Sequence, residues 1–144
     1  MKQFVLFLLF ISVTIYAKPL NKEISLQVIS DFMPVIMEGY SRGNTTFILN
    51  GKKNHLFTVL DQQLRHCGYL VLNKNKKYLD PNEVRIQATE KRDQDLIYIQ
   101  LALESITKEV LDTTKHTLTI MRVYHQTNSG VSPIGPITIG KFDE

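Results

Sequence analysis

Residues 45–72 read TTFILNGKKNHLFTVLDQQLRHCGYLVL, which predicts a strand, a helix and a second strand in immediate succession. The first strand is β-branched and aromatic, and Asn54 is a suitable N-cap for a helix that continues to about His66. Gly68 is a natural left-handed residue at the helix end, and residues 69–72 supply the second strand. A unit of this kind favours a right-handed crossover between two parallel strands, with the helix covering one face.

Downstream of this unit the pattern changes to that of an antiparallel sheet. After a polar turn at 73–81, apolar and polar residues alternate over 84–88 and again over 97–104. Such alternation indicates strands with one buried face. The mixed-charge residues 90–95 between them are expected to form a solvated hairpin turn.

The C-terminal part predicts a hairpin. A strand at about 115–126 changes its apolar face between Ile120 and Met121, which indicates either a β-bulge or a strand buried on both sides. An Asn-Ser-Gly turn follows, and the chain returns as a strand over 134–141. The two prolines near the start of this last strand make it an edge strand or an irregular one.

An amphipathic helix is predicted ahead of the β-α-β unit. Its apolar face is formed at spacings of three and four by Ile24, Val28, Phe32, Val35 and Ile36. Pro34 is expected to kink or break this helix near Met33. The apolar face either docks on the domain or binds a partner, in which case Phe32 and Val35 are the candidate contacts.

Residues 1–17 have the pattern of a secretory signal peptide, with Lys2, an apolar run over 4–11 and the small residue Ala17 at the exit. The run is shorter than the roughly 20 residues that span a bilayer. Cleavage after Ala17 is expected, and retention as a membrane anchor is the alternative. We therefore expect an exported chain, in the periplasm or associated with the envelope, with full secretion as the alternative.

These patterns together predict an α+β fold. Its parts are the signal peptide, an N-terminal amphipathic helix, one β-α-β unit and an antiparallel sheet with a C-terminal hairpin. We expect the helix and a linker to occupy 18–43 and a single α+β domain to occupy 44–144.

Composition and motifs argue against catalysis, metal binding and nucleic-acid binding. The net charge of +3 at pH 7 is too balanced for a phosphate-binding groove, and the cluster of Lys74, Lys76 and Lys77 suits a solvated loop. The four histidines lack the close spacing of zinc ligands. The sequence also contains no nucleophile elbow, paired-acid motif or phosphate loop, so we expect a non-enzymatic protein without cofactor or metal.

Cys67 is the only cysteine in the sequence, so it cannot form an intramolecular disulfide. It lies at a predicted helix end, where the helix dipole does not favour a thiolate. The neighbouring His66 points in another direction on the helix, because adjacent helical residues diverge by about 100°. Cys67 is therefore either a packed small apolar residue or a free thiol, and with Gly68 and Tyr69 we expect it to be structural.

Two segments resemble the TrbH family of conjugal transfer proteins. Residues 57–71 contain Leu64-Arg65, Gly68-Tyr69 and Val71, which is similar to the family's helix-to-strand pattern L-R-x-x-G-Y-x-V.

The C-terminal hairpin carries the second resemblance. Arg122 and Tyr124 lie on a strand that is followed by a polar turn and then by the Pro-x-Gly segment at 133–135. This is similar to the Arg-x-Tyr strand and Pro-x-Gly return near the end of family members. The order of export signal, helix, β-α-β unit and hairpin also agrees, so the resemblance spans most of the chain.

The resemblance implies a component of a type IV secretion or conjugation apparatus in the bacterial envelope, acting through contacts with other envelope proteins. Family members are often lipoproteins, but no cysteine follows the predicted cleavage site here. This leaves a soluble periplasmic protein or one held in the membrane by an uncleaved signal helix.

Arg122 and Tyr124 are the candidate partner contacts that the resemblance adds. Their alternative roles are structural: Tyr124 packs the sheet, and Arg122 pairs with a neighbouring acid. A stand-alone exported effector, either a small-ligand binder or a hydrolase, is the alternative function, and it predicts a deep pocket with convergent polar groups.

Overall fold

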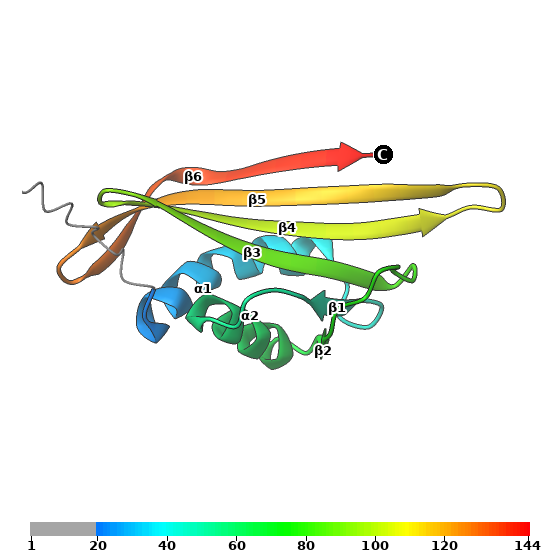
Figure 1. Ribbon diagram of the computed structural model, residues 1–144, viewed down its shortest axis with the longest axis horizontal. Coiled ribbons are helices and arrows are strands. Elements are labelled where there is room, and N and C mark those ends of the chain that lie inside the picture. The colour runs from blue at the N-terminus through cyan, green and yellow to red at the C-terminus, as the bar shows by residue number, and fades with distance from the viewer. Residues whose placement is uncertain (1–19) are drawn as a thin grey trace, which may run out of the picture.

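The computed structural model describes residues 20–144, so the predicted signal peptide lies outside the described residues. Over this range the chain forms two helices, α1 (Lys22–Gly39) and α2 (His55–His66), and one six-stranded sheet. The strands are β1 (Thr46–Leu49), β2 (Leu70–Asn73), β3 (Glu83–Asp93), β4 (Leu96–Lys108), β5 (Thr113–Thr127) and β6 (Gly130–Asp143). Figure 1 shows α1 and α2 side by side on one face of the sheet. The predicted α+β class is confirmed.

The sheet combines a parallel part with an antiparallel part. Its strand order is β2-β1-β3-β4-β5-β6, and β1 pairs in parallel with both β2 and β3. From β3 to β6 every pairing is antiparallel. The predicted β-α-β unit is therefore confirmed, and β6 lies at an edge of the sheet, as its prolines indicated.

Backbone and side-chain caps begin and end α2. The side chain of Asn54 accepts a hydrogen bond from the Phe57 N–H at 2.9 Å, which confirms the predicted N-cap. At the other end the N–H groups of Gly68 and Tyr69 donate to the carbonyls of Arg65 and Leu64. This double closure needs a left-handed residue, and Gly68 supplies it with a φ of +92°.

Of the kink or break predicted near Met33 because of Pro34, the break is wrong, because α1 continues from Lys22 to Gly39. A proline inside a helix removes one N–H and leaves the carbonyl four residues earlier without its usual partner. That carbonyl belongs to Ser30, and both Ser30 and Pro34 are on the exposed side of the helix. Water can therefore satisfy the carbonyl, and the buried face of α1 is not interrupted.

One apolar core joins the helices to the sheet. The buried apolar side chains of α1 are Val28, Ile29, Phe32, Met33 and Ile36, and they belong to the same core as buried residues of α2 and the strands. On β4 the alternation is strict, with Ile97, Ile99, Leu101 and Leu103 buried. The apolar face of α1 thus docks on the domain, while the boundary between 18–43 and 44–144 stays a prediction.

The irregularity predicted near Ile120 of β5 lies instead on the neighbouring strand β6. The β4–β5 pairing continues without a shift through Ile120 and Met121, so β5 itself is regular. The shift occurs between β5 and β6, where Met121 pairs with Thr138 but Val123 pairs with Ile134. The extra residues belong to β6, and its Gly135 has a φ of +70°.

We expect Gly68→Ala to lower the free energy of unfolding by about 1–2 kcal/mol, because a Cβ is disfavoured in the left-handed conformation. Urea denaturation of the purified protein measures this change. Gly39→Ala is the matched control, since Gly39 has no left-handed φ and no neighbouring atom lies within 4 Å of where its Cβ would stand. Equal effects of the two substitutions would contradict the assigned role of Gly68.

Candidate functional site

A polar link connects α1 to β5 through the carboxylate of Asp31. The Tyr124 hydroxyl donates to Asp31 Oδ2 at 2.8 Å, and Arg122 Nη1 donates to the same oxygen at 3.1 Å. Arg122 Nε also donates to the Gly135 carbonyl at 3.2 Å. One carboxylate therefore ties the helix to β5, and Arg122 extends the connection to the irregular part of β6.

The environment of Tyr124 keeps its hydroxyl protonated. Its side chain is fully buried, and burial first, then the hydrogen bond to Asp31, raises the pKa of Tyr124 above its ordinary value. The hydroxyl therefore stays protonated near neutral pH and remains a donor to Asp31. Hydrogen bonds to a charged acceptor contribute about 1.5–3 kcal/mol to stability.

The four candidate partner contacts occupy two kinds of environment. Phe32 and Tyr124 are fully buried in the core, whereas Val35 and Arg122 are only partly buried. A partner could reach atoms of Val35 and Arg122 without rearrangement of the core. The contact role of all four stays a prediction.

No sequence motif marks Asp31, the residue on which this link depends. Its spacing is the sequence feature that could have indicated a contact with the domain. Asp31 lies three residues after Val28 and four before Val35, at the border of the apolar stripe. Its two partners on β5 are more than ninety positions away in the chain, and no local pattern identifies them.

The three residues expected to be structural surround the end of α2. Tyr69 is 4 % exposed, its hydroxyl donates to the Tyr40 carbonyl at 2.7 Å, and its ring packs edge-on against Phe47. Cys67 is a partly buried free thiol that packs against the core. Gly68 makes the left-handed turn between them.

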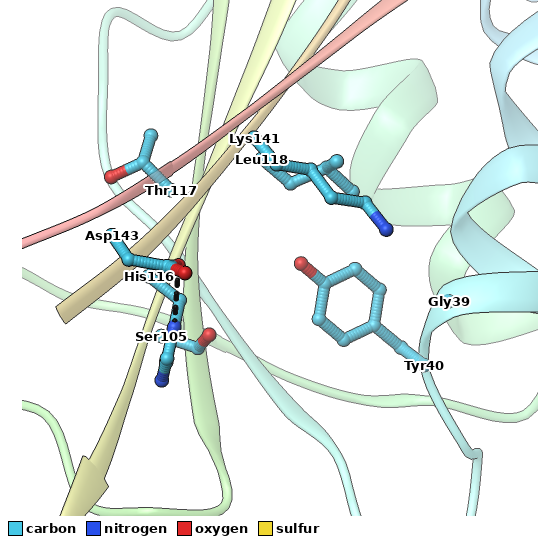
Figure 2. A pocket seen from close by; sticks show the side chains of 8 residues that line it. All are labelled: Gly39, Tyr40, Ser105, His116, Thr117, Leu118, Lys141 and Asp143. Atoms are coloured by element: carbon cyan, nitrogen blue, oxygen red, sulfur yellow. Dashed lines mark hydrogen bonds and ion pairs between the residues drawn. The ribbon is translucent and has the colours of Figure 1, made fainter. Parts of the chain in front are cut away.

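A cavity of about 260 Å³ lies at the C-terminal end of α1, between this helix and the ends of β4, β5 and β6. Figure 2 shows the Tyr40 hydroxyl directed into it, with Lys141 on one side and His116 and Asp143 on the other. Burial raises the pKa of Tyr40 to about 12, so its hydroxyl is neutral near pH 7. The cavity can therefore offer hydroxyl, ammonium and carboxylate groups to a small polar molecule.

His116 connects two side chains beside this cavity. Its Nδ1 lies 2.7 Å from Asp143 Oδ1, and its Nε2 lies 2.8 Å from Thr107 Oγ1. The order carboxylate, imidazole, hydroxyl is that of a nucleophilic triad, but Thr107 is exposed and is not part of the cavity lining. The cavity is also smaller than the roughly 300–1,000 Å³ of typical ligand pockets.

The edge strand β6 exposes apolar side chains. Ile134, Ile139 and Phe142 are 47 %, 50 % and 62 % exposed. Proline interrupts only the first half of the strand, so residues 137–143 form an uninterrupted strand edge. A long strand edge of this kind is a template for pairing with another chain.

Among residues 20–144, no group of three His, Cys, Asp or Glu side chains is arranged to hold a metal ion. In the same part of the chain, neither α1 nor α2 is long and apolar enough to cross a membrane.

Comparison with models of known protein families gives a match. A family model described as conjugal transfer protein TrbH matches residues 12–143. No curated protein and no solved structure matches the chain significantly.

We expect Tyr124→Phe to lower the free energy of unfolding by about 1.5–3 kcal/mol, because the ring is kept and only the hydrogen bond to Asp31 is lost. Urea denaturation at neutral pH measures the change. Tyr98→Phe is the control, since the structure gives the Tyr98 hydroxyl no hydrogen bond to another residue of 20–144. A loss no larger for Tyr124→Phe than for Tyr98→Phe would show that the link does not stabilise the fold.

Proposed function

The chain belongs to the TrbH family of conjugal transfer proteins, and we propose that it acts there as a non-enzymatic envelope component through contacts with other subunits. The match covers residues 12–143, which is nearly the whole chain. It supports a place in the conjugation apparatus, and the predicted signal peptide supports a place in the envelope.

The free edge of β6 is the observation that carries this proposal. The strand is 14 residues long, and its only neighbour within residues 20–144 is β5. The opposite edge of the sheet is the short strand β2, of four residues. Added strands gain affinity from backbone hydrogen bonds and specificity from side chains next to the edge, and β6 offers both.

Helix α1 is a weaker candidate for the same contact. Its apolar face is already covered by the sheet and α2, so binding a partner through that face would require exposure of the core. The exposed large apolar side chains of α1 are those of Leu26 and Met37. The proposal therefore assigns the main contact to residues 137–143 of β6.

The rival function is a stand-alone effector that binds or hydrolyses a small molecule. The feature that would serve it is the cavity beside His116 and Asp143. Its small volume and the exposed position of Thr107 favour the contact role over this rival.

We expect the double substitution I139K/F142K to reduce conjugal transfer at least about tenfold, the effect of losing 1.4 kcal/mol of contact free energy. Lysines on an edge strand oppose pairing with another chain. The measurement is the transfer frequency of cells in which the gene is deleted and the variant is supplied in its place.

The matched control is Leu70→Lys, which adds a lysine to β2 at the other edge, where Leu70 is 58 % exposed. Thermal unfolding of each purified variant verifies that the fold is kept. Wild-type transfer by the folded double variant would count against a contact through β6.

A second prediction separates the proposal from its rival. His116→Ala should leave transfer within about twofold of wild type, because the proposed contact uses the outer backbone groups of β6, which this substitution on β5 does not remove. His125→Ala, at an exposed position of β5, is the control. Loss of transfer by a folded His116→Ala protein alone would favour a chemical role for the cavity.

A further inference from the structure

The β4–β5 hairpin projects beyond the rest of the sheet, as Figure 1 shows. The pairing of β3 with β4 reaches Glu104, and the pairing of β6 with β5 begins at His116. Beyond these residues, 107–108 pairs with 113–114, and no third strand of the described chain joins them. The end of the hairpin is therefore a two-stranded arm that packs on no other strand.

Two large apolar side chains form the tip of this arm. Val110 is 100 % exposed and Leu111 is 97 % exposed. The turn is closed by the Glu109 N–H, which donates to the Asp112 carbonyl at 2.8 Å. We call residues 109–112 the hairpin tip.

Turn formation does not account for this apolar pair. Turns between antiparallel strands favour Gly, Pro, Asn, Asp and Ser. The chain follows this rule in the β5–β6 hairpin, where Asn128 and Ser129 precede Gly130. At the tip it carries Val110 and Leu111 instead, and neither is covered by other residues. A second surface that buries these two side chains would contribute the free energy of apolar burial, which the chain itself does not provide at the tip.

The charges beside the apolar pair are acidic. Within residues 20–144, Glu109 and Asp112 form no ion pair. Two lysines are near the tip: Lys115 lies 3.5 Å from Glu104, and Lys108 directly precedes Glu109 in the chain. The pKa of Asp80 is lowered chiefly by its hydrogen bond to Lys76 and further by the charge of Lys108.

We propose that the hairpin tip inserts Val110 and Leu111 into an apolar pocket on another subunit of the transfer apparatus, and that Lys or Arg side chains line the rim of that pocket. The inference rests on the proposed function as a transfer component. Central apolar anchors with complementary charges at the rim are typical of protein interfaces. An anionic lipid surface attracts basic segments, so the two acids of the tip favour a protein pocket over a membrane.

The test uses V110N/L111G in the full chain, supplied to cells that lack the gene. Asn and Gly are turn-forming residues, so we expect the variant to unfold at or above the wild-type temperature. We expect its transfer frequency to fall at least about tenfold, as for loss of an interface anchor. The apolar variant V110I/L111M should transfer at the wild-type level, and Glu109→Lys should reduce transfer because it opposes the basic rim.

Two controls separate this inference from its alternatives. Tyr78→Asn removes another exposed apolar side chain, 72 % exposed, and should leave transfer unchanged; a loss equal to that of V110N/L111G would overturn a specific role for the tip. Sedimentation with phosphatidylglycerol-containing vesicles should show no binding of the purified chain. Vesicle binding that V110N/L111G abolishes would assign the tip to a lipid surface and overturn the inference.

The deletion itself tests the underlying proposal. If deletion of the gene leaves transfer unchanged, the proposed function fails, and this inference fails with it. If deletion abolishes transfer but folded V110N/L111G restores it fully, only the assignment of the tip fails.

Discussion

The burial of a single face of the sheet beneath α1 and α2 is the constraint on which the other features depend. The right-handed crossover places α2 on one face of the parallel strands, and α1 joins the same apolar core. The alternating apolar residues of β4 are buried in this core on the sheet side. Because both helices of the described chain lie on one face (Figure 1), they leave the other face, the β6 edge and the end of the β4–β5 hairpin uncovered.

The Asp31 carboxylate adds a polar link to the apolar contacts that hold α1 on this face. It ties the helix to β5 through Tyr124 and Arg122, and the Gln27 side chain donates to the Val131 carbonyl of β6. The cavity near Tyr40 and His116 lies where α1 ends above the strands that continue. The polar link and the cavity both depend on this helix position, whereas the free edge of β6 follows from the strand order. Partly buried polar links of this kind favour a unique arrangement when all their groups are satisfied, and here the phenol, guanidinium and carboxylate all have partners.

The domain exposes two separate apolar features, the β6 edge and the hairpin tip. The β6 edge presents backbone groups along its length, and the hairpin tip presents Val110 and Leu111 at the end of the neighbouring β4–β5 pair. They differ in kind, because an edge binds through backbone pairing and a tip binds by insertion into a pocket. A component of the conjugation apparatus that joins two neighbours would use such a division, with each feature serving a different contact.

The sequence by itself determined the elements whose signals are local: the β-α-β unit, the caps at Asn54 and Gly68, the alternation in β3 and β4, and the edge position of β6. Helix spacing, turn residues and proline act within a few positions of the chain, so these predictions needed no tertiary information. Tertiary structure alone decided the partners of Asp31 and His116, because strand register brings together residues far apart in sequence. It also decided that Pro34 is tolerated in α1 and that Val110 and Leu111 are uncovered. Both outcomes depend on which neighbouring elements pack there and where they end.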